Sequence, residues 1–136
     1  MVQLSTKYRV LLSFVLPLIC LAFFLSSCQK KELPELSVYA SAITEDESEN
    51  TTIVWTVENN SNTVATFEEG NLAIVQINGR NLGNKIAECS LEAGESMSIS
   101  IPLHDIKRYC DNEITITALC QEGTSATYKF TLTALK

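Results

Sequence analysis

Apolar and polar residues alternate along most of the chain after residue 35. The alternation is strict at 96–101 (SMSISI) and at 113–118 (EITITA), and it returns at 126–132. Side chains with a period of two point to opposite faces of an extended strand, so we expect these segments to be strands with one buried face. Less regular patterns of the same kind predict further strands at 35–43, 51–58, 72–77 and 84–89.

The spacing of these segments predicts how the strands are arranged. About seven strands fall within about 100 residues, and turn-forming pairs such as Asn78-Gly79 and Glu122-Gly123 stand between them. A single sheet would leave an apolar face in water, whereas two sheets packed face to face bury it. The predicted fold is therefore an all-β, immunoglobulin-like, two-sheet antiparallel β-sandwich that spans 35–136.

The first 27 residues have a different character. Lys7 and Arg9 precede a stretch at 10–25 that is apolar except for Ser13 and Pro17. A helix that spans a bilayer needs roughly 20 apolar residues, and this stretch is shorter. A basic start, a short apolar middle and an exit of small residues are typical of a secretory signal. We expect 1–27 to be a signal helix that is removed.

The exit from this segment, Leu25-Ser26-Ser27-Cys28, resembles the lipobox of bacterial lipoproteins. The resemblance implies that the Cys28 thiol carries a diacyl group built on fatty acids such as palmitate, and that cleavage occurs just before Cys28. Two or three acyl chains anchor a protein stably, whereas one binds membranes only marginally. Residues 28–34 would form a lipidated tether. The alternative is an uncleaved signal anchor in which Cys28 has no role.

The residues after Cys28 suggest a location. Gln29 is not the aspartate that retains many lipoproteins in the inner membrane, so the outer membrane is the expected site. Residues 29–32 (QKKE) resemble the charged tag that directs some Bacteroidetes lipoproteins to the cell surface, although Lys31 stands where that tag has an acid. The net charge of −6 includes Lys7 and Arg9, so the chain without its signal is more acidic still. Such a chain lacks the basic face that nucleic-acid binding requires.

Several short motifs between 51 and 120 occur in a familiar order. They are VWTVENNSN at 54–62, VQING at 75–79, LEAGES at 91–96 and ITITA at 114–118. In this order they resemble the bacterial immunoglobulin-like modules of the CARDB kind, and similar strings occur in proteinase-inhibitor sandwiches. The resemblance implies the fold, with Leu91 closing one end of the sandwich and Gly94 allowing the turn into the next strand. It does not specify the function.

Cys89, Cys110 and Cys120 follow the anchor cysteine in the chain. If the strands at 84–89, 96–101 and 113–120 run alternately up and down, Cys89 and Cys120 lie at one end of the sandwich and Cys110 at the other. A disulfide needs Cα atoms within about 7 Å, so Cys89–Cys120 is the candidate pair. Three unpaired thiols are the alternative, because connectivity cannot be read from sequence.

The residues that could support catalysis or metal binding are few. His104 is the single histidine, and it lies with Asp105 and Cys110 in the 102–112 loop without a recognised metal-ligand spacing. No serine or cysteine shows a nucleophile motif beside it. The acidic run at 45–50 lacks the glycine turn of a calcium loop, so we expect a solvated loop. We expect neither an enzyme, nor a metal site, nor a cofactor.

These observations lead to one expected function and one alternative. The expected function is that of a lipid-anchored envelope lipoprotein whose sandwich is a non-catalytic binding, adhesion or assembly module. Such a module binds through its loops or a sheet edge, and its partner could be a protein or a glycan. The alternative is a proteinase inhibitor that acts on extracytoplasmic proteases through the 102–112 loop.

Overall fold

The computed structural model describes residues 31–46 and 50–133. The chain divides into two units, Met1–Lys31 and Glu32–Lys136, and the fold reported below is that of the second. The expected signal helix and Cys28 lie outside the described residues. The strands are β1 (Leu36–Glu45), β2 (Thr51–Asn59), β3 (Ala65–Phe67), β4 (Ile74–Ile77), β5 (Arg80–Leu82), β6 (Cys89–Leu91), β7 (Ser96–Leu103), β8 (Asp111–Leu119) and β9 (Ser125–Thr133).

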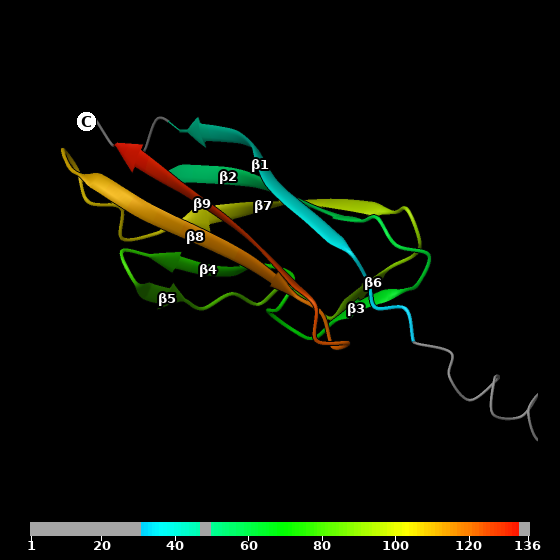
Figure 1. The fold of residues 1–136 in the computed structure, drawn as a ribbon. Coiled ribbons are helices and arrows are strands. Elements are labelled where there is room, and N and C mark those ends of the chain that lie inside the picture. Colours follow the sequence, from blue (N-terminus) through cyan, green and yellow to red (C-terminus); the bar gives the residue numbers. More distant parts are fainter. Residues whose placement is uncertain (1–30, 47–49, 134–136) are drawn as a thin grey trace, which may run out of the picture. The chain divides into compact units, whose positions relative to one another are not determined.

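Two larger antiparallel sheets and one two-stranded ribbon form the described domain, and the predicted all-β sandwich is confirmed (Figure 1). One sheet has the strand order β1-β2-β7, and the other has the order β5-β4-β8-β9. A small ribbon of β3 and β6 lies at the end of the domain where β1 begins (Figure 1). β1 lies alongside β9, so the two sheets meet on that side (Figure 1). On the other side the edge strands are β7 and β5.

The core follows from the alternation in the sequence. In β2 the side chains of Ile53, Trp55 and Val57 are fully buried. In β8 those of Ile114 and Ile116 are fully buried as well, so the two long strands supply the facing halves of one core. Trp55 is a packing residue, as expected, and its indole N–H donates a hydrogen bond to the carbonyl oxygen of Leu72 at 3.0 Å. Leu91 is fully buried, and Gly94 has a φ of 75°, in agreement with the roles expected for them.

Two strands were not predicted, and one predicted strand overlaps the observed strand at a single residue. β3 and β5 have three residues each, too short to show a period. Most of the expected strand at 84–89 is irregular, and β6 begins only at its last residue. The side chain of Asn84 explains this, because its Nδ2 donates to the carbonyl oxygens of Gly70 and Ala73 and its Oδ1 accepts from the N–H of Ile86. The Ile86 carbonyl in turn accepts from the N–H of Gly70, so this segment bonds to a loop and not to a strand.

Asn78 and Gly79 form the tight turn that the sequence predicts. Their φ angles are 49° and 79°, and Ile77 pairs directly with Arg80 across the turn. Positive φ at both central residues defines a type I′ turn, which matches the twist of the flanking strands and favours Asn-Gly. The chain therefore returns at once as β5, which forms the outer edge of the four-stranded sheet.

Candidate functional site

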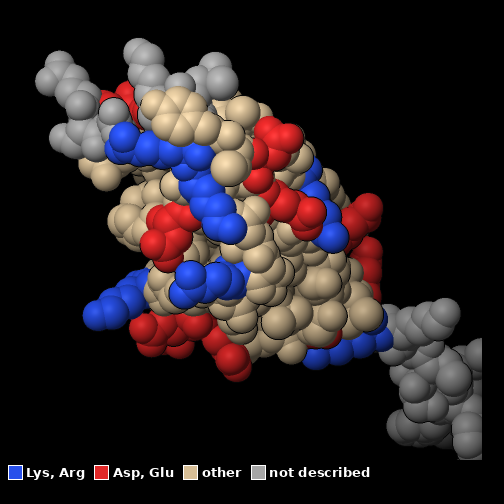
Figure 2. Space-filling model, turned by 90° about the vertical axis from the view of Figure 1, so that its left-hand side faces the viewer, with Lys and Arg blue, Asp and Glu red and all other residues tan. Residues whose placement is uncertain are grey.

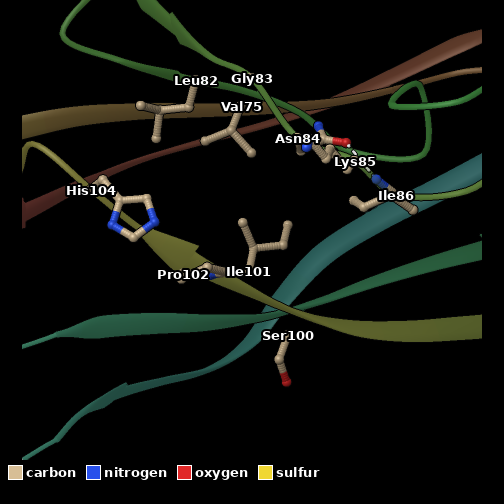
Figure 3. Close-up of a pocket in the computed structure, with 10 residues that line it drawn as sticks. All are labelled: Val75, Leu82, Gly83, Asn84, Lys85, Ile86, Ser100, Ile101, Pro102 and His104. Atoms are coloured by element: carbon tan, nitrogen blue, oxygen red, sulfur yellow. Dashed lines mark hydrogen bonds between the residues drawn. The ribbon is translucent and has the colours of Figure 1, made fainter.

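An apolar pocket of about 270 Å³ opens between the two sheets on the side of β7 and β5. Its lining comes from β4, β5, β7 and the irregular segment at 83–86, and it is drawn in Figure 3. The side chains of Val75, Leu82 and Ile101 point into the space between these elements (Figure 3). That of Ser100 points to the opposite face of its sheet (Figure 3). The pocket is therefore the point at which the sandwich core becomes accessible from its side.

The ionisable side chains that line this pocket differ from the acidic majority of the chain. Lys85 and His104 belong to its lining, and no aspartate or glutamate does. They stand on opposite sides of the apolar floor, and both residues are exposed (Figure 3). In a chain with 16 acidic and 10 basic residues, an acid-free opening is suited to a ligand that is apolar and carries negative charge.

The backbone of β7 provides polar groups along the same opening. The N–H of Asn59 donates to the carbonyl of Glu95, and the carbonyl of Asn59 accepts from the N–H of Gly94. Asn59 therefore directs both of its backbone groups toward the β7 side, and alternate residues of β2 must do the same. The register pairs Val57 with Met97 and continues without a shift to Thr51. The residues of β7 that bond to β2 are Met97, Ile99, Ile101 and Leu103.

The other four residues of β7 direct their backbone groups away from β2. They are Ser96, Ser98, Ser100 and Pro102. Within the described part of the chain, no backbone hydrogen bond to these outward groups is found. Pro102 has no N–H, and its place at an outward position is where a strand tolerates proline. The free edge of β7 therefore offers three N–H donors and four carbonyl acceptors.

The remaining edge strands have features that discourage pairing, and β7 has few. β1 has a register irregularity between Ala40 and Ala42, and it lies alongside β9. β9 carries Lys129, and β5 has only three residues, one of them Arg80. Irregularities, charges and short lengths all protect sheet edges from added strands. β7 has eight residues and no charged side chain, so Pro102 is its single protective feature.

The opposite end of the domain from the β3–β6 ribbon carries the loop between β7 and β8. Asn112 is fully buried and holds this loop, because its side chain bonds to the N–H and carbonyl of Lys107 and to the carbonyl of Cys110. Tyr109 lies in the loop with 76% of its surface exposed and a φ of 58°. An exposed aromatic residue at this position was not predicted from the sequence.

A smaller polar pocket of about 170 Å³ lies between this loop and the β4–β5 turn. Its lining includes Arg80, Asp105 and Lys107. Figure 2 views the domain from this end and shows lysine and arginine side chains beside acidic ones. Charges of both signs line this pocket, so it selects against neither sign of ligand.

Cys89, Cys110 and Cys120 are free thiols in the structure, and the candidate Cys89–Cys120 disulfide is not formed there. Cys89 pairs with Phe67 across one edge of β3. On the other edge, Thr66 accepts from the N–H of Gln121 and donates to the carboxylate of Glu122. β3 therefore lies between the two cysteines, and two strand spacings of about 4.8 Å exceed the reach of a disulfide. β3 was not predicted from the sequence, so the expected pairing of Cys89 with Cys120 did not take it into account.

Two side chains near β3 have altered acidity. Burial raises the pKa of the Cys89 thiol. Burial would also raise the pKa of Glu122, but hydrogen bonds from the backbone of Glu122 and Thr66 and from the side chains of Cys120 and Thr66 outweigh it and lower that pKa. The Cys120 thiol lies in the same turn, 3.2 Å from the carbonyl oxygen of Thr124.

The remaining expectations concern metals and membranes. Among the described residues, no three histidine, cysteine, aspartate or glutamate side chains lie close enough together to hold a metal ion. His104 lies at the apolar pocket and Cys110 in the Asn112-bound loop. No helix within the described ranges is long and apolar enough to cross a membrane. A comparison with protein-family models finds no match, and a comparison with curated proteins finds none either.

Proposed function

We propose that the chain is a lipid-anchored lipoprotein of the bacterial outer membrane, and that its β-sandwich is a non-catalytic binding, adhesion or assembly module. The LSSC sequence ending at Cys28 supports the anchor. The observation that carries the binding role is the unpaired, uncharged edge of β7 beside an apolar pocket. Exposed edges and apolar openings of this kind are characteristic of interaction sites.

The direction of β1 fits this proposal. The N–H of Asn60 bonds to the carbonyl of Glu35, so the chain enters the domain at the end where β2 finishes. The loop that Asn112 holds lies at the other end, and the β7 edge runs between the two ends (Figure 1). Within the described domain, both surfaces therefore lie away from the residue at which the chain enters.

The anchoring part is tested by Cys28→Ala. The variant should lose the acyl groups and retain the signal, so its mass should rise by that of residues 1–27 and fall by that of the lipid. Ser26→Ala, which keeps a small residue in the same motif, is the matched control and should be processed normally. An unmodified Cys28 in the wild-type protein contradicts the anchor.

The binding part is tested with a photo-reactive amino acid introduced on either side of the domain in the cells that produce the protein. Position 85 lies at the apolar pocket, and position 129 is an exposed lysine on β9. Both replacements remove one lysine, so their effects on net charge are equal. Cross-linked adducts should form at position 85 and not at position 129. Equal adducts at both positions, or none at 85, contradict the binding role of this face.

A second candidate function is proteinase inhibition through the loop between β7 and β8. The observation that favours it is the rigid presentation of this loop, whose backbone is fixed by Asn112 while Tyr109 is exposed. A loop that enters a protease active site without being cleaved must be held in one conformation, because its rigidity reduces the entropy lost on binding. A panel of secreted proteases assayed with the purified protein tests this. Inhibition that Tyr109→Ala abolishes supports it, and the absence of inhibition excludes it for that panel.

A further inference from the structure

We propose that the partner of the β7 edge is an extended polypeptide segment that joins the three-stranded sheet as a fourth strand, places apolar side chains in the pocket and carries an acidic residue near Lys85. The inference rests on the proposed function, because it names the class of partner for the same face. The partner is a strand of another protein, and not a lipid, a small apolar molecule or a second copy of this chain.

The backbone of β7 favours a polypeptide over other apolar ligands. The outward groups of Ser96, Ser98 and Ser100 repeat along the strand at intervals of two residues. Another extended backbone presents donors and acceptors at the same interval, whereas an acyl chain presents none. A lipid would leave these groups facing an apolar ligand without hydrogen-bond partners, which is unfavourable when water is excluded.

The pocket specifies which side chains the added strand needs. Paired residues on neighbouring strands project to the same face of a sheet, so residues opposite Ile99 and Ile101 project toward the core. Val75 and Leu82 then form the opposite wall, since their side chains point into the same space (Figure 3). Two apolar residues separated by one other residue fill this opening. The residue between them projects to the outer face, where the exposed Ser100 side chain lies, and is polar.

The side chains beside the pocket indicate where the partner segment carries an acidic residue. They also disfavour a second copy of this chain as the partner. Lys85 and His104 border the pocket, and no acidic residue lines it, so an aspartate or glutamate beside the apolar residues is attracted. If the β7 edges of two copies paired with each other, Lys85 of both copies would lie at the same interface. The pairing would also join two domains that each carry an excess of acidic residues. Both effects repel, which favours a different chain.

The test uses a nine-residue synthetic peptide as its probe, with alternating valine and threonine and an aspartate at one end. A second peptide with lysine in place of aspartate is the charge control. The purified full chain should bind the aspartate peptide more tightly, by about fivefold at low salt, and the difference should decrease at high salt. The free protein should sediment as a monomer. Equal binding of the two peptides, no binding, or self-association of the free protein through β7 overturns the inference.

Two variants test whether the peptide binds at the outer edge of β7. Ser100→Pro removes one outward N–H, and Ser100→Ala removes only the hydroxyl group. The proline variant should bind the peptide at least about fivefold more weakly, and the alanine variant should bind like the wild type. Fluorescence of Trp55, the single tryptophan, reports whether each variant is folded. Lys85→Glu changes an exposed residue and should reverse the preference between the two peptides, so the test does not depend on the proline variant folding.

The location of the bound peptide is read from amide hydrogen exchange. Binding should slow exchange at Ser98 and Ser100, while Ile99 and Ile101 are already protected by their bonds to β2. If cross-links form at position 85 in cells but the peptide does not slow exchange at Ser98 and Ser100, the proposed function stands and the added strand is excluded. Absence of cross-linking would overturn the proposed function itself, so the two failures are distinguishable.

Discussion

Replacement of Asn59 by alanine should be among the most destabilising polar substitutions in this domain. The side chain is fully buried at the end of β2. Its Nδ2 donates to the carbonyl oxygens of Thr63, Leu91 and Glu92 at 2.7, 3.0 and 3.2 Å. Its Oδ1 accepts from the backbone N–H and the hydroxyl of Ser61 at 3.1 and 2.6 Å. One amide thus joins β2, the following turn and β6.

The magnitude follows from what the truncation leaves behind. An intramolecular hydrogen bond contributes about 0.5–1.5 kcal/mol net, and a buried group that loses its partner costs about 1–3 kcal/mol. The bonds to Leu91 and to Ser61 are buried, while those to Thr63 and Glu92 are partly open to water. Loss of the buried bonds to Leu91 and Ser61, together with the partly open ones, predicts a destabilisation of about 3 kcal/mol. A domain of this size has a free energy of unfolding of about 5–15 kcal/mol, so the loss is a large fraction of it.

The assay is equilibrium unfolding in urea, followed by the fluorescence of buried Trp55. Asn60→Ala is the matched control, because Asn60 is adjacent and exposed and its side chain bonds to the exposed Ser37 hydroxyl. The control should lose less than about 1 kcal/mol. A loss below about 1 kcal/mol for Asn59→Ala, at an unchanged denaturant slope, would show that this amide does not hold the three segments together.

Two further predictions concern the residues around β3. Since the pKa of Glu122 is lowered in the folded state, its carboxylate stabilises the domain above the unfolded pKa, and this is lost as the pH falls through the folded pKa. The stability of Glu122→Gln should therefore change less than that of the wild type between about pH 6 and about pH 3, and equal changes would contradict the bond to Thr66. In thiol labelling followed by peptide mapping, the exposed Cys110 should react first, Cys89 more slowly because burial raises its pKa, and Cys120 only on unfolding. A Cys89–Cys120 disulfide in the native protein would contradict this order.

The long strands were predictable because the alternation of apolar and polar residues indicates which of their side chains are buried. β7 and β8 alternate strictly, and their ends in the structure differ from the predicted ends by two residues at most where the pattern is clearest. β3 could not be predicted, because three residues hold no period and its pairing partner, β6, is distant in the chain. The 84–89 segment has apolar residues typical of a strand, but the side chain of Asn84 satisfies the backbone of a loop instead.

The site was less predictable than the fold for a physical reason. A strand is an edge strand when it has a neighbour on one side only. β7 pairs with β2 alone, and the sequence of β7 does not show this. The pocket likewise depends on where 83–86 passes relative to Ile101. A signal was nevertheless present: of the two strictly alternating segments, the one at 96–101 has no charged residue, and Pro102 follows it directly. Such a strand cannot be central at Pro102 without losing a ladder bond, which indicates an edge.

The proposed binding at the outer edge of β7 requires that this edge is free in the unbound protein. Residue-resolved hydrogen exchange on the purified full chain measures this. The exchange rates should alternate along the strand, with the amides of Ser98 and Ser100 exchanging at least about tenfold faster than those of Ile99 and Ile101. Slow exchange at all four amides in the free protein would show that the edge is already covered and is not available to a partner.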